Sequence, residues 1–130
     1  MPRDGVRDSA PPPDGLDEVA RVLWRRIRDD LRARSLWRDT DAGVLERYVR
    51  SESRARQAYA QITSHDGSLE LTTVGSQGQL VEHPAIKIAR AAELDCQKYA
   101  EALLLTPAAR QRHQLESEVA ARTGLDAGLD

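Results

Sequence analysis

The stretch LVEHPAIKIA, residues 80–89, changes from extended chain to helix within a few residues. Pro84 suits the first turn of a helix, because its φ is already helical and it has no backbone N–H to leave unpaired. His83 is pushed toward extended geometry by the proline that follows it. Apolar residues then recur at spacings of four and three, which predicts a helix from Pro84 to about Leu104. This apolar stripe comprises Ala85, Ala89, Ala92, Cys96, Tyr99 and Leu103.

A β-hairpin is predicted directly before this helix. Leu69, Leu71 and Thr73 alternate with polar residues, and the extended pair Leu80–Val81 follows a five-residue loop at 75–79. A lone hairpin is marginal in water. The hairpin is therefore expected to lie on the helices or to pair with a neighbouring subunit.

Two amphipathic helices are predicted before the hairpin, one over about 16–35 and one from Asp39 or Thr40 to about Thr63. Each carries arginines on one face, and two interpretations of these faces stay open. They are either solvated surfaces paired with acids such as Asp17 and Asp29, or surfaces that bind phosphate. The candidate DNA-binding residues are Arg21, Arg25, Arg28 and Arg32 on the first helix and Arg47, Arg50 and Arg54 on the second.

The C-terminal part is predicted to be a polar helix from Thr106, with Gly124 as its stop and a loose end after it. Prolines and glycines at 1–15 indicate a disordered N-terminal arm. The predicted organisation is thus an arm at 1–15, a helical domain at 16–113 with the hairpin at about 68–82, and an acidic tail at 114–130.

The composition predicts a thin core. Of the 130 residues, 40% are hydrophobic but only 4% are aromatic, and the helix at 84–104 is lined with alanine. A thin core favours burial of apolar surface between subunits, so a homo-oligomer is expected. The net charge is −2, yet residues 16–63 carry +3 and residues 114–130 carry −3. The candidate residues for packing between subunits are Ile88, Ala92, Tyr99 and Leu103.

Catalytic and metal-binding patterns are missing from the sequence. With one cysteine and three scattered histidines, no metal cluster, disulfide or cofactor motif is expected. The neighbours His65 and Asp66 lie in a turn, where aspartate usually bonds local backbone, and Cys96 lies on the apolar stripe. His83 is interpreted as structural and His113 as exposed. No enzyme activity, signal peptide or membrane span is predicted.

The motifs EHPAIKIA at 82–89 and LTPAAR at 105–110, about twenty residues apart, give the chain a family resemblance. From roughly Leu16 to Arg112 it resembles phage terminase small subunits. The shared features include the first helix with Trp24, the second helix after WRDTD at 37–41, and the β-prone insert before His83–Pro84.

The resemblance implies a mainly α fold of about four helices with a hairpin between the second and third, assembled into a ring-like homo-oligomer. It also implies binding of double-stranded viral DNA and regulation of the terminase large subunit, which holds the ATPase and nuclease. Such a phage-encoded protein would act in the host cytoplasm. The alternative is a helical DNA-binding regulator or a protein–protein adaptor that takes no part in packaging.

Overall fold

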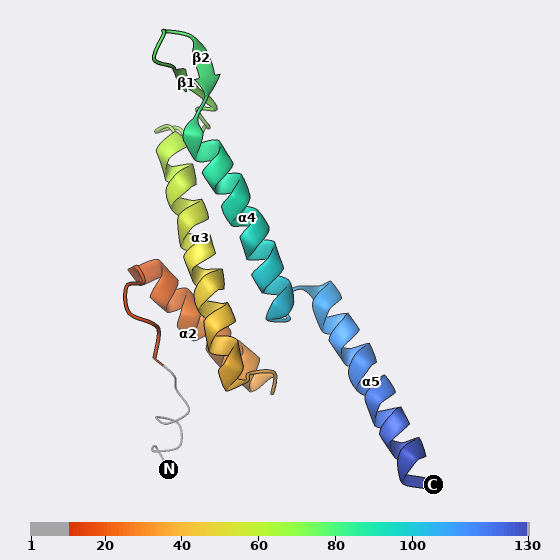
Figure 1. Cartoon of the computed structure of the whole chain (residues 1–130). Coiled ribbons are helices and arrows are strands. Elements are labelled where there is room, and N and C mark those ends of the chain that lie inside the picture. The colour runs from red at the N-terminus through yellow and green to blue at the C-terminus, as the bar shows by residue number, and fades with distance from the viewer. Residues whose placement is uncertain (1–10, 130) are drawn as a thin grey trace.

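The computed structural model describes residues 11–129, with side chains to residue 124. Most of the predicted N-terminal arm, residues 1–10, lies outside the described residues. The fold is mainly helical with one antiparallel hairpin, as predicted (Figure 1). Its elements are α2 (Glu18–Ala33), the short 3-10 helix η1 (Asp39–Asp41), α3 (Ala42–Ile62), β1 (Thr72–Val74), β2 (Leu80–Glu82), α4 (Pro84–Ala102) and α5 (Pro107–Leu129).

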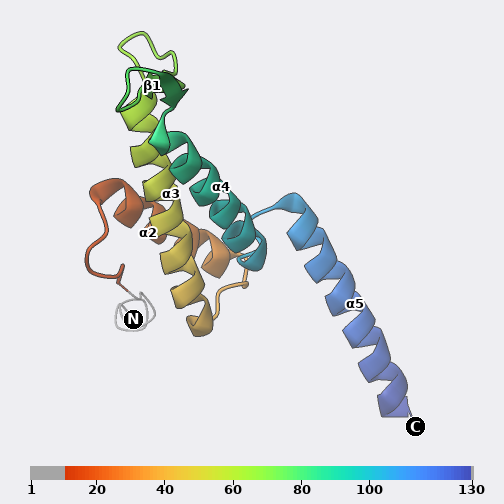
Figure 2. The same ribbon diagram turned by 45° about the horizontal axis from the view of Figure 1, so that its top comes forward.

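Helices α3 and α4 lie side by side and form the long axis of the molecule (Figures 1 and 2). The alanines of α4 face α3, where Ala85 and Ala89 pack with Ala58 and Ile62. Small side chains allow two helices to approach closely along their length. The alanines of the apolar stripe are therefore buried within one chain, whereas its Tyr99 stays half-buried.

Helix α2 crosses the beginning of α3 and forms a second cluster. Trp24 is 1% exposed and lies in this cluster, whereas the neighbouring Leu23 is only half-buried. Leu103, at the end of α4, joins the same cluster, so the cluster links α2, α3 and α4. Its buried members are Leu16, Ala20, Trp24, Ile27, Leu31, Leu45, Val49 and Leu103.

The helix ends are set by side chains that the sequence offers at those positions. His83 caps α4, because its Nδ1 accepts a hydrogen bond from the backbone N–H of Ala85 at 3.1 Å. Helices α2 and α4 are both followed closely by a residue with positive φ, Ser35 at 59° and Leu104 at 61°. Neither residue is glycine, so both positions cost conformational energy that the surrounding packing must offset.

The hairpin projects beyond the end of the α3–α4 pair (Figure 1). Its strands pair Thr72 with Glu82 and Val74 with Leu80, which leaves the five-residue loop at 75–79 that the sequence predicted. Leu69 does not extend β1; instead it pairs with Thr63 at the end of α3. The apolar side chains of Val74 and Leu80 remain exposed within the described chain.

Helix α5 extends away from the other helices (Figures 1 and 2). It continues through Gly124 to Leu129, so the predicted stop at Gly124 is wrong. Glycine permits the left-handed conformation that ends many helices but does not impose it, and inside a helix it costs only about 1 kcal/mol relative to alanine.

The packing of α4 on α3 gives a test. Ala92 is 0% exposed against α3, whereas the neighbouring Ala91 is exposed. Replacement of Ala92 by arginine forces a charge into this contact, and we expect a loss of about 3 kcal/mol or more in the free energy of unfolding. Urea denaturation followed by circular dichroism measures it. The free energy of unfolding of the control variant Ala91→Arg should lie within about 0.5 kcal/mol of the wild-type value. Equal losses in both variants would contradict this arrangement.

Candidate nucleic-acid interface

An arginine ridge runs along one exposed face of α3. We define this ridge as Arg47, Arg50 and Arg54, all on the surface, at the helical spacing that the sequence indicated. Gln57 and Gln61 continue it toward the hairpin and are also exposed. The ridge therefore presents guanidinium groups, followed by side-chain amides, in a line along one helix.

The ion pairs of the ridge are loose and solvated. Arg50 lies 3.5 Å from Glu46, and Arg54 lies 3.7 Å from Asp95 on α4, with half-exposed side chains in both pairs. The Arg47 carbonyl accepts a hydrogen bond from the Ser51 hydroxyl at 2.8 Å, whereas its guanidinium has no hydrogen bond or ion pair among the described residues. Exposed pairs of this kind contribute little to stability, so these arginines can exchange their carboxylates for another anion at small cost.

The ridge adjoins a hollow at the beginning of α2. This hollow has a volume of about 300 Å³ and is lined by Arg50 and Arg54 together with Ser53, Gln57 and the turn at Gly15. The Nη2 of Arg50 donates a hydrogen bond to the backbone carbonyl of Asp14 at 3.2 Å. This bond holds the arginine at the edge of the hollow. Two arginines and several polar donors thus converge on one depression.

Asp17 fastens the beginning of α2 to α3. Its carboxylate accepts a hydrogen bond from the Ser53 hydroxyl at 2.6 Å and caps α2 by accepting from the Ala20 N–H at 2.8 Å. Arg56 lies 3.5 Å away. The Ser53 bond, with the cap and Arg56, lowers the pKa of Asp17. Arg21, four residues after Asp17, pairs instead with Glu18 at 2.8 Å.

The four candidate arginines of α2 have different environments. Arg21 and Arg25 are exposed and Arg32 is half-buried, but Arg28 is only 8% exposed. The guanidinium of Arg28 binds Asp29 at 2.9 Å. Burial and this pair make Arg28 the least accessible of the predicted DNA-binding residues.

The four candidate packing residues of α4 also divide. Ala92 and Leu103 are buried inside the chain, at 0% and 3% exposed. Ile88 is 46% exposed, and Tyr99 is half-buried with the Lys98 ammonium 5.7 Å from its ring centre. Of this set, Ile88 and Tyr99 have surface to offer to another molecule.

The histidines and the cysteine have structural environments. Asp66, beside His65, accepts hydrogen bonds from the Ser68 backbone N–H and hydroxyl, which lower the pKa of this carboxyl within a local turn. Cys96 is buried, and burial with the nearby Glu52 raises the pKa of its thiol to about 12. His113, predicted to be exposed, is half-buried, because α5 starts close to the end of α4.

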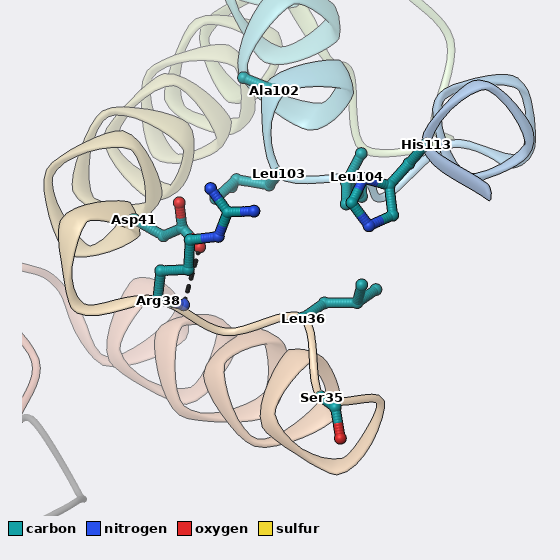
Figure 3. A pocket seen from close by; sticks show the side chains of 8 residues that line it. All are labelled: Ser35, Leu36, Arg38, Asp41, Ala102, Leu103, Leu104 and His113. Carbon is teal, nitrogen blue, oxygen red and sulfur yellow. Dashed lines mark hydrogen bonds between the residues drawn. The ribbon is translucent and has the colours of Figure 1, made fainter. Parts of the chain in front are cut away.

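Figure 3 shows the hollow that His113 lines, of about 220 Å³, where α2 and α4 both end. Leu36, Leu103 and Leu104 provide its apolar wall, and Arg38 reaches in from the chain before η1. The Asp41 carboxylate accepts a hydrogen bond from the backbone N–H of Arg38 at 3.0 Å. The hollow lies between the two left-handed turns at Ser35 and Leu104, and His113 of α5 lines one side of it.

Neither a metal site nor a membrane span is found in the described residues. Across residues 11–124, no group of three or more His, Cys, Asp or Glu side chains is placed to hold a metal ion. None of the described helices has the length and apolar content needed to cross a membrane.

The described chain is thus a small helical protein with an arginine-bearing surface on one helix. Residues 20–119 match the family model of the phage terminase small subunit. The chain belongs to the phage terminase small subunit family, which is generally non-catalytic and acts with a large subunit and DNA. No curated protein and no solved structure matches the chain.

The contacts of Asp17 predict a pH-dependent anchor for α2. Asp17→Ala removes the cap and the Ser53 bond, and we expect a loss of about 1 kcal/mol at pH 7 in the free energy of unfolding. Because the folded pKa of Asp17 is lowered, its contribution is present above the unfolded pKa and is lost as the pH falls through the folded pKa. Denaturation series at several pH values should show wild type and Asp17→Ala converging in acid. Asp17→Asn, which can still cap, is the control; a difference between wild type and Asp17→Ala that is constant with pH would contradict the role of this carboxylate.

Proposed function

We propose that the arginine ridge of α3 holds double-stranded viral DNA by its phosphates, and that this terminase small subunit regulates the large subunit while bound. The observation that carries the proposal is the line of surface arginines with loose carboxylate partners on one rigid helix. A guanidinium can donate two parallel hydrogen bonds to a phosphate. Arg21, Arg25 and Arg32 of α2 are the secondary candidates, and Arg28 contributes least because it is buried.

The proposal includes a ring-like homo-oligomer. One chain has a net charge of −2 and a short ridge, so a monomer would bind DNA weakly. Repetition of the ridge around a closed assembly makes the contacts act together and raises the avidity. Backbone contacts give modest sequence preference and strong dependence on salt. The site of action is then the host cytoplasm, where the phage genome is packaged.

The polar C-terminal helix is proposed to contact the large subunit. Glu116 and Glu118 are exposed on α5, and the tail at 114–130 carries −3. An acidic helix that stands clear of the body can reach a basic surface on a partner without moving the DNA-binding helices. Its charge also keeps DNA away from this end of the molecule.

The arginine ridge gives the main test. Replacement of Arg47, Arg50 and Arg54 together by alanine should weaken DNA binding and flatten its salt dependence. The slope of log affinity against log salt should fall by about 0.9 for each phosphate that the variant no longer neutralises. Fluorescence anisotropy across a salt series measures both quantities, and native mass spectrometry verifies that the assembly persists.

The matched control is the triple alanine variant of Arg21, Arg25 and Arg32 on α2, which removes the same charge. We expect a smaller loss of affinity from this variant than from the ridge variant. Unchanged affinity and slope in both intact assemblies would refute DNA binding by these helices.

The acidic tail gives a separate test. Glu116→Gln combined with Glu118→Gln removes two exposed carboxylates while keeping helix-forming side chains. We expect weaker stimulation of the large subunit's ATPase, with DNA binding unchanged or stronger, because repulsion of phosphate is reduced. ATP hydrolysis by the large subunit, titrated with each variant, measures the effect. Wild-type stimulation by the variant would leave these residues a role in solubility only.

A further inference from the structure

Beyond its first two turns, where Ala109 is buried and His113 half-buried, helix α5 has no packing partner among the described residues. Its first turn is held firmly: the Arg110 guanidinium donates a hydrogen bond to the Leu105 carbonyl at 2.9 Å, and Thr106 Oγ1 accepts from the Ala109 N–H at 3.1 Å. These bonds direct α5 away from α3 and α4, as Figure 2 shows. Beyond this turn, Leu115 is 54% exposed and Val119 is 61% exposed. An isolated helix of this length is marginal in water unless another surface covers its apolar side.

The α3–α4 pair carries an open groove along one side. Two adjoining hollows of about 410 and 660 Å³ share Glu52, Cys96 and Gln97, so they form one continuous depression. Its floor is made of small side chains, Ala55 at 7% exposed and Cys96 at 9%. The thiol stays neutral, since its pKa is raised to about 12. We call this depression the α3–α4 groove; its further lining residues are Tyr48, Arg56, Tyr59, Glu93, Ala100, Glu101 and Thr106.

The rim of the groove is acidic. The described lining residues include three acids, Glu52, Glu93 and Glu101, and a single cation, Arg56. Arg56 is itself 3.5 Å from Asp17. A helix that settles in this groove therefore needs apolar side chains for the floor and a cation for the rim.

We propose that the α3–α4 groove receives α5 of a second copy of this chain. Leu115, Val119 and Arg122 lie on one face of α5 at spacings of four and three, all exposed, and we call them the docking stripe. The stripe supplies two apolar side chains for the floor and a cation for the acidic rim. The inference rests on the proposed homo-oligomer and names the surfaces that build it.

The lengths of the two partners agree. Leu115 and Arg122, the ends of the docking stripe, are seven positions apart on α5, about 10 Å, and the acids Glu93 and Glu101 are eight positions apart on α4, about 12 Å. The occupant belongs to another copy because the bonds of Arg110 and Thr106 point α5 away from the groove of its own chain. Glu116 and Ala120 are offset from the stripe and stay available on the assembled protein, whereas Glu118 borders the stripe, four residues before Arg122.

The test compares two double substitutions on the same helix. Leu115→Asp with Val119→Asp places charges in the docking stripe, and Ser117→Asp with Ala121→Asp places the same charges, four residues apart, on another face of α5. Native mass spectrometry and light scattering over a dilution series of the full chain measure assembly. We expect the stripe variant to raise the concentration for half-assembly by about a hundredfold or more, and the second variant to assemble like wild type.

The groove is tested from its other side with Gln97→Trp, which fills the depression, against Ala91→Trp, which lies outside it. Dissociation by Gln97→Trp alone supports the proposal, with circular dichroism confirming that each variant is folded. If wild type is a monomer, both this inference and the proposed oligomer fail. If the wild-type oligomer persists in the stripe and groove variants, the inference fails while the oligomer stands. Loss of large-subunit stimulation without loss of assembly would assign the stripe to the large subunit and likewise overturn it.

Discussion

The close contact between the alanine stripe of α4 and the facing side of α3 is the constraint on which the remaining structure depends. Because Ala85, Ala89 and Ala92 are small, the two helices lie near each other along most of their length. The hairpin is only the connection between them, and α2 is held where Trp24 meets the start of α3 and Leu103. A larger side chain in the stripe would separate the helices and open both clusters.

That contact also decides which residues are left for other molecules. Once α4 covers one side of α3, the arginine ridge remains on an exposed face beside it, and its carboxylate partners are solvated. The same packing places Glu52 on the rim of the α3–α4 groove and Ala55 and Cys96 on its floor. One helix therefore presents a cationic face and borders an acidic groove, which separates surfaces suited to phosphate from surfaces suited to a helix.

The junction between α4 and α5 fixes the direction in which α5 leaves the other helices. Leu104 has a positive φ, and the Arg110 guanidinium binds the carbonyl of Leu105, so the chain turns and leaves the body in a defined orientation. A leucine in the left-handed conformation is costly, and such a cost is kept only where surrounding contacts fix the turn. The result is a helix whose Leu115 and Val119 remain exposed within the described chain.

Local chemistry in the sequence determined the elements: Pro84 with its cap His83 set the start of α4, the loop at 75–79 set the hairpin, and spacing set the surface arginines of α3. These signals act over a few residues, so periodicity and capping suffice to read them. Tertiary packing decided what lies far apart in the sequence. It buried Arg28 and brought the Asp17 carboxylate within hydrogen-bond distance of the Ser53 hydroxyl. It also buried Ala92 and Leu103 inside the chain. A helical face can be read from its spacing, but the element that covers it depends on how the whole chain folds.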